Sequence, residues 1–270
     1  MKKYLIVSGD SFTKGHRMGE LGSWAYHTAK KINLELINLS DNGMSNEWIS
    51  NNLLLYLYSN PHILSESVVM VGWTDFAREL IYYNARYEKH QTSKTSFMVC
   101  TPVDIHGDAD GGHSSHILDN YIKPYRDIVG RFIGDELVNL HKTYFSILHT
   151  KSFLENNDIP YLFFDAVADN ELYSDNNQYY LKGRHDMKYE INFNEIEDVE
   201  FIKTYKNKEI IHYIFDSNYI KFENTSIFGW LSKDGNFKYE KGNPGHTNEL
   251  GADYIANIIV NEYEKLYNKG

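Results

Sequence analysis

Short apolar runs alternate with longer amphipathic stretches over the first two thirds of the chain. Each run has four to six residues and is closed by small or polar residues, which is typical of strands buried on both faces. The strands predicted in this way cover residues 4–7, 34–39, 68–72, 97–100 and 159–164.

Helical spacing of apolar residues fills the gaps between these runs. It predicts helices over 17–32, over 75–87 and within 117–156, and a last helix over 248–267. Strand–helix alternation favours a parallel sheet with helices on both faces. We therefore expect an α/β fold with a parallel sheet of about five strands, forming a single domain over 1–270.

Residues 169–241 have a different character. They are rich in Asn, Tyr, Lys and Glu and show no clear period, so we interpret them as an insertion across one end of the sheet, containing short helices or a hairpin. Many late tyrosines fall in this stretch. They predict either an exposed aromatic platform for sugars or ordinary core packing, as at Tyr179, Tyr180, Tyr205, Tyr213 and Tyr219.

Composition and net charge limit the classes of partner that the protein can bind. The chain has 270 residues, 42% of them hydrophobic, and a formal net charge of −10, which argues against a nucleic-acid partner. The single cysteine excludes an internal disulfide. The first apolar run is too short for a signal peptide or a membrane span. We therefore expect a cytoplasmic protein with no membrane partner; no oligomeric state is indicated.

The first candidate for chemistry is Ser11, in the sequence Gly9-Asp10-Ser11-Phe12 directly after the first predicted strand. Ligands bind at the carboxyl ends of parallel strands, so a serine here can act as a nucleophile whose own N–H helps to hold an oxyanion. The alternative is that Asp10 or Ser11 only caps the following helix.

A second candidate, His246, stands just ahead of the last predicted helix. It can serve as the general base for Ser11, but only the fold can bring together two residues so distant in sequence. The alternative interpretation is a surface histidine in a turn. The combined positions of the two residues favour the pairing.

These motifs, in this order, resemble those of the SGNH or GDSL-type hydrolases, which are esterases and acyl hydrolases. Residues 9–12 match the first conserved sequence block of that family, residues 38–46 match the second, and His246 and Gly251 match the last. The resemblance implies a three-layer α/β/α flavodoxin-like fold in which the C-terminal helix follows the histidine block. It also implies Ser11 as nucleophile, the backbone N–H groups of Ser11 and Gly43 as oxyanion donors, and no cofactor or metal.

Two positions depart from the pattern of that family. Thr74 stands where an asparagine usually donates to the oxyanion, and its hydroxyl is the predicted substitute. Asn243 stands at the position of the triad acid, where an amide can orient the imidazole but supplies no charge. Either a Ser–His dyad operates, or Asp234 or Glu240 replaces the acid, or the site has lost hydrolytic activity.

Four residues near these motifs are predicted to bind substrate. They are Asp10, Trp73, Asp75 and His106. His106 belongs to a polar loop, residues 104–113, that partly matches a calcium-binding loop. The twelfth position of such a loop, counted from His106, is Ile117 instead of glutamate, so a substrate-binding loop is favoured over a metal site.

The motifs together predict a serine esterase that hydrolyses small acyl esters, above all O-acetyl esters of a carbohydrate. An acyltransferase built on the same site is one alternative. A non-catalytic glycan-binding or structural module is another, because losing the acid and one oxyanion donor is how such a site would decay. The sequence Gly72-Trp73-Thr74 also resembles SGNH-like proteins of tailed phages, which makes a virion-associated location an alternative to the cytoplasm.

Overall fold

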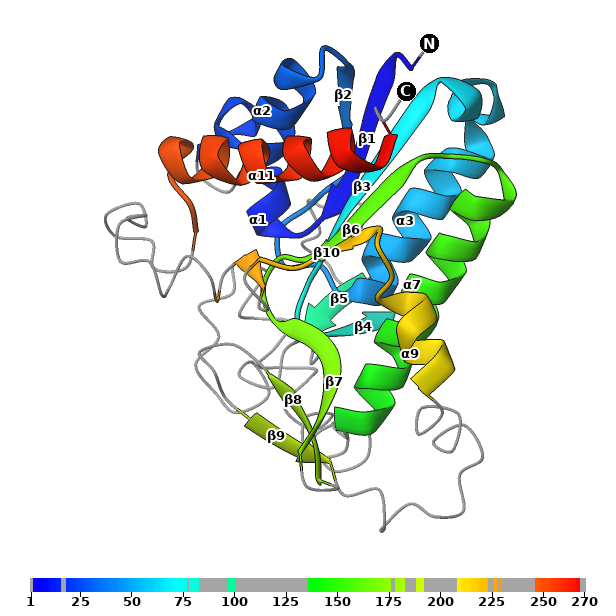
Figure 1. Ribbon diagram of the computed structural model, residues 1–270, viewed down its shortest axis with the longest axis vertical. Coiled ribbons are helices and arrows are strands. Elements are labelled where there is room, and N and C mark those ends of the chain that lie inside the picture. The colour runs from blue at the N-terminus through cyan, green and yellow to red at the C-terminus, as the bar shows by residue number, and fades with distance from the viewer. Residues whose placement is uncertain are drawn as a thin grey trace, which may run out of the picture.

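The computed structural model contains a central parallel sheet flanked by helices on both faces (Figure 1). It describes residues 2–15, 18–76, 78–82, 97–100, 136–175, 178–182, 188–191, 208–222, 226–227, 229 and 246–267. The strands are β1 (Tyr4–Gly9), β2 (Glu35–Asn38), β3 (Ser67–Trp73), β4 (Glu79–Tyr82), β5 (Phe97–Cys100), β6 (Tyr161–Asp165), β7 (Asp169–Asp175), β8 (Gln178–Lys182), β9 (Lys188–Ile191) and β10 (Tyr219–Ile220). The helices are α1 (Ser11–Lys14), α2 (Trp24–Lys31), α3 (Asn46–Ser59), α7 (Glu136–Asn156), α9 (Lys208–Ile214) and α11 (Glu249–Tyr267), with 3₁₀ turns at η1 (Glu20–Gly22) and η2 (Pro61–Glu66).

The central sheet has the strand order β2-β1-β3-β6-β10, and its neighbouring strands all pair in parallel. This is the flavodoxin-like order, in which the connections change direction between β1 and β3. The predicted α/β class is confirmed. The order also puts the carboxyl end of β1 at the switch point, where α/β folds bind ligands.

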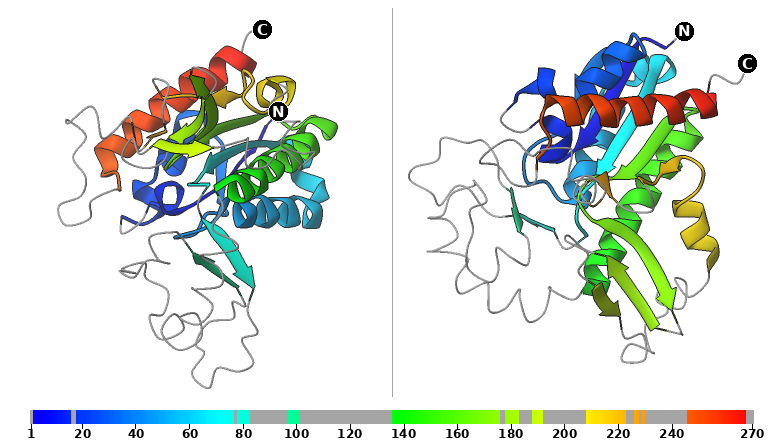
Figure 2. Two further views of the ribbon diagram at one scale, coloured as in Figure 1. Left: turned by 90° about the horizontal axis from the view of Figure 1, so that it is seen from below. Right: turned by 60° about the vertical axis from the view of Figure 1, so that its left-hand side comes forward.

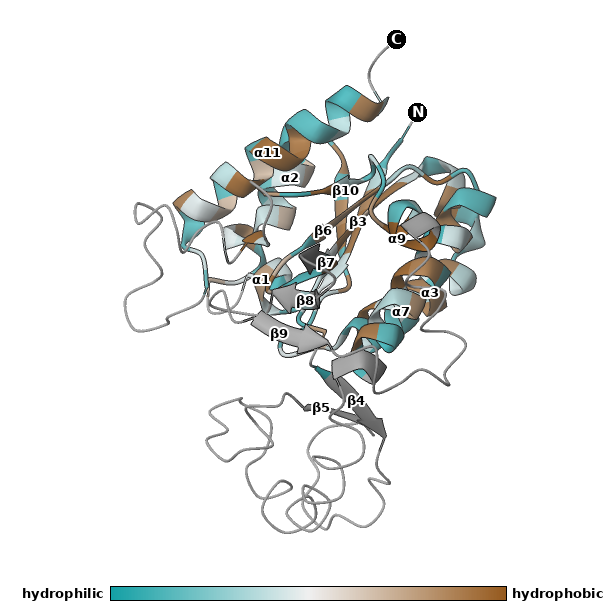
Figure 3. Ribbon diagram, turned by 60° about the horizontal axis from the view of Figure 1, so that its bottom comes forward, coloured by the Kyte–Doolittle hydropathy of each residue, from teal (hydrophilic) through white to brown (hydrophobic). Residues whose placement is uncertain are grey.

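Both faces of the sheet are apolar, because successive side chains of a strand point to opposite sides. Val69, Val71 and Phe163 pack toward α3, α7 and α9, and Val68, Met70 and Phe164 pack toward α2 and α11. The three layers are visible in the two further views (Figure 2), and the strands between the helices are mostly hydrophobic (Figure 3).

Two predicted elements of the first half are corrected. Residues 79–82, placed in a helix over 75–87, form strand β4. The predicted strand at 97–100 exists as β5, but it pairs antiparallel with β4 and lies outside the parallel sheet. The residues Leu80-Ile81-Tyr82 have high strand propensity. Hydrogen bonding to β5 then favours a strand over a helix, and this pairing is not visible in the local sequence.

The fifth strand of the central sheet is β10, which lies inside the stretch predicted to be an insertion. Tyr219 and Ile220 pair with Phe163 and Phe164 of β6. The start of the stretch forms a separate antiparallel sheet of β7, β8 and β9, so it does contain a hairpin. Residues 208–222 therefore belong to the main fold, while the predicted boundaries 169–241 of the insertion stay a prediction.

The helix ends follow from local capping. The predicted helix 17–32 is shorter, because Ser23 caps α2 by accepting from the N–H of Tyr26. Helix α11 is confirmed over nearly the whole predicted range. The described part of the 117–156 region is helix α7. Within the described part of the chain, no helix combines the length and the apolar character that crossing a bilayer requires.

Candidate active site

Ser11 begins a short helix directly after β1, and close packing fixes its place. Asp10 caps this helix by accepting from the N–H of Phe12 at 3.0 Å. Thr13 packs against the sheet at Gly9, where an added Cβ would lie 2.2 Å from Thr13 Oγ1 and 3.0 Å from the carbonyl oxygen of Gly72. Glycine at position 9 therefore lets α1 sit directly on the ends of β1 and β3.

His246 lies beside Ser11, as predicted from their positions in sequence. Its Nε2 atom is 2.8 Å from Ser11 Oγ, within hydrogen-bond distance. The imidazole stacks on the ring of Phe12, with centroids 4.9 Å apart and an interplanar angle of 27°. Ser11 is only 7% exposed, and the Nδ1 atom of His246 is shielded from solvent. A nucleophile in contact with a base is the basic requirement for nucleophilic catalysis.

The loop after β2 approaches the same end of the sheet. Gly43 has φ of 72°, in the left-handed region that favours glycine. The N–H of Asp41 donates to the carbonyl of Gly9 at 3.2 Å, and Asp41 also forms an ion pair with Lys14 of α1. The loop that carries Gly43 is therefore tied to both sides of the Ser11 turn.

Thr74 follows β3 and is fully buried between these loops. Its hydroxyl donates to Asp10 Oδ2 at 2.8 Å, and its N–H donates to Asn46 Oδ1 at 2.7 Å. Its carbonyl accepts from the side-chain amides of Asn46 and Asn170. Because the single hydroxyl proton is directed to Asp10, this arrangement does not aim Thr74 at an oxyanion, in contrast to the role predicted for it.

Asp10 directly precedes Ser11 and is buried. Its side chain is 0% exposed, and both carboxylate oxygens accept hydrogen bonds. The second oxygen also meets Nη1 of Arg78 at 2.9 Å. The sequence motifs did not single out Arg78, and only its proximity to Thr74 in sequence hinted at a role. Asp10 is thus buried among protein donors, and its predicted role as a substrate ligand stays a prediction.

The other predicted substrate residues are placed less favourably or lie outside the structure described. Trp73 is fully buried in the core, edge-on to Phe163, so it is not part of an open pocket. Asp75 is half-buried at the turn after Thr74, where its carbonyl accepts from the N–H of Arg78. His106 and the acid position Asn243 lie outside the described residues, as do Asp234 and Glu240.

A second group of buried polar side chains lies at the end of β6. Asp165 accepts from Tyr219 Oη at 2.7 Å and from Asn170 Nδ2 at 2.5 Å. Burial raises the pKa of the Asp165 carboxyl to about 7, and the neighbouring Asp169 carboxylate adds to the rise, while the hydrogen bonds from Tyr219 and Asn170 oppose it. Asn170 also donates to the Thr74 carbonyl, so this group is linked to the Ser11 side of the sheet.

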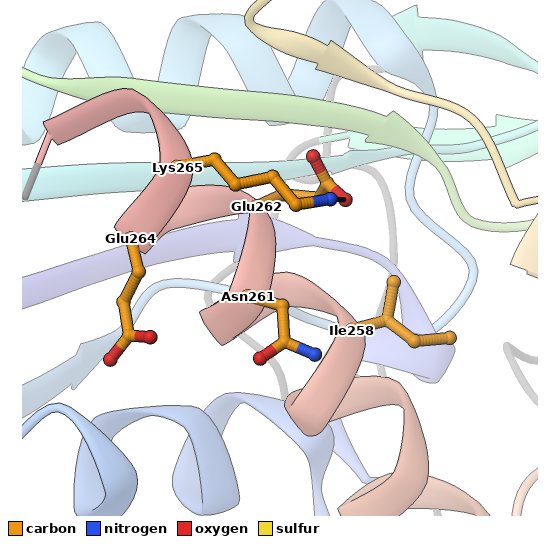
Figure 4. A pocket seen from close by; sticks show the side chains of 5 residues that line it. All are labelled: Ile258, Asn261, Glu262, Glu264 and Lys265. Atoms are coloured by element: carbon orange, nitrogen blue, oxygen red, sulfur yellow. Dashed lines mark hydrogen bonds and ion pairs between the residues drawn. The ribbon is translucent and has the colours of Figure 1, made fainter. Parts of the chain in front are cut away.

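Two surface hollows differ in their relation to the site. One of about 510 Å³ lies along the second half of α11, where Glu262 and Lys265 form an ion pair (Figure 4). Its described lining contains neither Ser11 nor His246. The other, of about 380 Å³, adjoins the end of α1 and the loop before Gly43. It is lined by Lys14, Gly15, Gly19, Glu20, Asn38, Ser40 and Asn42.

Metal binding has no support in the part of the chain that the structure describes. No three His, Cys, Asp or Glu side chains gather there as a ligand set. The loop 104–113, which was weighed as a metal site, lies outside that part.

Comparison with known proteins returns esterases among the solved structures. No protein-family model matches the sequence, and no curated protein matches it either. The esterase EstA from Pseudoalteromonas sp. is 10% identical with a TM-score of 0.47, over 99% of this chain and 100% of that chain. TesA is 8% identical with a TM-score of 0.48, over 98% and 99%. The acetyl xylan esterase AlAXEase is 14% identical with a TM-score of 0.42, over 95% and 97%. Because these TM-scores are below 0.5, the site rests on its own geometry.

Proposed function

We propose that the protein is a serine ester hydrolase in which Ser11 is the nucleophile and His246 the general base. The observation that carries this proposal is the 2.8 Å contact between Ser11 Oγ and His246 Nε2 at the carboxyl end of β1. Two residues 235 positions apart meet here at the switch point of the sheet, where the fold presents ligands.

The reaction proceeds in two halves. In the first, Ser11 Oγ forms a bond to the ester carbonyl carbon while its proton passes to His246 Nε2. The tetrahedral intermediate collapses, the bond to the alcohol oxygen breaks, and the imidazolium protonates the departing alcohol. In the second half, His246 takes a proton from water, the resulting hydroxide attacks the acyl carbon, and Ser11 Oγ leaves with the proton.

The oxyanion is held by backbone N–H groups in this proposal. The donors are those of Ser11 and Gly43, with the loop of Gly43 braced against Gly9 by the Asp41 hydrogen bond. Backbone donors that are fixed before the reaction stabilise the developing charge without reorganisation. Thr74 supports the site through Asp10 instead of contributing a third donor.

The proposed acyl group is small and the proposed alcohol is rich in hydroxyls, as in an O-acetylated carbohydrate. Support comes from the hollow beside α1, whose amide, hydroxyl and charged side chains suit a polyol better than a lipid tail. The aromatic platform receives less support, because Tyr219 is buried and donates to Asp165, and Tyr213 donates to Glu155.

The test is hydrolysis of p-nitrophenyl acetate by the wild type, Ser11→Ala and His246→Ala. We expect both variants to lose at least about a thousand-fold in kcat. Thr247→Ala, next to the histidine, is the matched control and should stay close to the wild type. Equal rates in the wild type and Ser11→Ala would overturn the proposal. Release of acetate from acetylated xylo-oligosaccharides, with a p-nitrophenyl octanoate comparison, tests the proposed substrate class.

Asn243 is tested separately as the acid position. A carboxylate facing the imidazole stabilises its cation, so Asn243→Asp should raise kcat if this residue stands at the predicted place. An unchanged pH–rate profile would instead favour a site that operates as a Ser–His dyad.

A further inference from the structure

The side chain of Arg78 connects two loops that are far apart in sequence. Its Nη1 atom donates to Asp10 Oδ2 at 2.9 Å and to the backbone carbonyl of Met44 at 3.2 Å. The Arg78 side chain is 7% exposed and that of Asp10 is 0% exposed. A single buried nitrogen is therefore shared between the turn before Ser11 and the loop after Gly43.

Each end of this bridge is rigidly attached to a proposed catalytic group. On one side, Asp10 accepts from the N–H groups of Phe12, Thr13 and Lys14 through its side chain and its carbonyl, which fixes the turn that carries Ser11. On the other side, Met44 directly follows Gly43, and Ser45 then caps helix α3. A movement of the guanidinium would thus be transmitted to both oxyanion donors.

We propose that Arg78 is a positioning residue that holds the Ser11 turn and the Gly43 loop at the separation that an oxyanion requires. This inference rests on the proposed function. Two other direct ties, the 3.2 Å backbone bond from Asp41 to Gly9 and the ion pair of Asp41 with Lys14, both hold the loop ahead of Gly43, whereas Arg78 holds it at Met44, directly after Gly43. A charge-assisted bond in a buried site is stronger and more directional than a neutral one. An error of about 1 Å between reacting groups can cost on the order of a hundred-fold in rate.

The same kind of contact occurs at the opposite edge of the sheet and provides a matched control. Lys151 of α7 is fully buried, pairs with Asp216 Oδ2 at 2.7 Å and donates to the carbonyl of Tyr213. It pairs with Glu155, which also accepts from Tyr161 at the start of β6, whereas Ser11 follows the carboxyl end of β1. Both cations join a carboxylate to a backbone carbonyl, so their loss should affect stability in a similar way and catalysis differently.

The experiment compares Arg78→Gln, Arg78→Lys and Lys151→Gln with the wild type. Thermal unfolding, kcat and KM for p-nitrophenyl acetate are measured, all at a temperature where each variant is folded. We expect Arg78→Gln to lower kcat about 30–100-fold with KM within about three-fold, because the oxyanion donors act mainly in the transition state. Lys151→Gln should lower the melting temperature comparably and leave kcat within about two-fold.

Arg78→Lys keeps the buried charge and should recover most of the lost kcat, to within about ten-fold of the wild type. If Arg78→Gln does not fold, Arg78→Met, which keeps the apolar stem without the charge, takes its place, and a kcat and KM equal to those of the wild type in that variant would overturn the inference. A folded Arg78→Gln with wild-type kcat, or an equal kcat loss in Lys151→Gln, would overturn it as well. A wild type whose turnover does not depend on Ser11 would instead refute the proposed function.

Discussion

Two buried aspartates stand at the same edge of the sheet, and their surroundings are opposite. Asp10, after β1, faces the Arg78 guanidinium, the Thr74 hydroxyl and a backbone N–H. Asp165, at the end of β6, faces a second carboxylate, Asp169, and neutral donors. Thr74 lies between them, bonded to Asp10 through its hydroxyl and to Asn170 through its carbonyl.

The difference shows that the carboxyl ends of the strands can hold buried carboxyl groups in two different electrostatic environments. A carboxylate that accepts hydrogen bonds from a guanidinium, a hydroxyl and a backbone N–H is held in one place and can fix a neighbouring turn. A carboxyl that is buried beside another carboxyl favours its protonated form, because two adjacent negative charges are costly in a low-dielectric interior. We expect the first to support catalysis by position and the second to set the pH dependence of stability.

Of the substitutions in this comparison, replacing Asp10 should change the free energy of unfolding most. Asp10→Asn leaves the Arg78 guanidinium buried without its counter-charge, which should lower the free energy of unfolding by about 3–5 kcal/mol. Urea unfolding at pH 7 measures this loss. A loss below about 1 kcal/mol would mean that the pair does not hold the turn.

The second aspartate should respond in a pH-dependent way. Its folded pKa of about 7 is raised above the ordinary value, so its contribution to stability is complete below about pH 4 and is lost as pH rises through 7. Asp165→Asn cannot ionise, so its stability relative to the wild type should improve by roughly 2–4 kcal/mol between pH 4 and pH 8. A relative stability that does not change with pH would contradict the account of this carboxyl.

A substitution at Thr74 tests whether its hydroxyl serves Asp10 or the oxyanion. Thr74→Val removes the hydroxyl that donates to Asp10, at a cost of about 1–2 kcal/mol in stability. Because that proton is not directed at substrate, kcat should fall less than ten-fold. A fall of a hundred-fold or more would restore the oxyanion role predicted from sequence. Thr74→Ser, which keeps the donor, is the control.

The smallest expected effect concerns the hydroxyl of Tyr219. Tyr219→Phe removes one donor to Asp165, a hydrogen bond worth about 1 kcal/mol in stability. The bond favours the ionised carboxyl, so the loss should be greater at pH 8 than at pH 5. Urea unfolding curves at the two pH values provide the measurement. An equal loss of unfolding free energy at both would mean that the bond does not favour the ionised form of Asp165.

Much of this architecture follows from local sequence, and the supporting network does not. The inner strands of the sheet and helix α11 are each predicted by an uninterrupted pattern of apolar residues. Ser11 and His246 could be paired from sequence because each lies next to one of these elements. The partner of Asp10 is Arg78, 68 residues away, and nothing local marks a carboxylate that will be buried against a guanidinium. Strands β4 and β10 were missed because they are short and depend on distant partners.

The central claim is that Ser11 is a nucleophile activated by His246, and covalent trapping tests it most directly. The wild type, Ser11→Ala and His246→Ala are incubated with an alkyl fluorophosphonate and followed by intact-protein and peptide mass spectrometry. We expect one adduct per wild-type chain, located on Ser11, none in Ser11→Ala, and much slower labelling in His246→Ala. Labelling of Ser11→Ala to the same extent as the wild type, or no adduct on a folded wild type, would contradict the account.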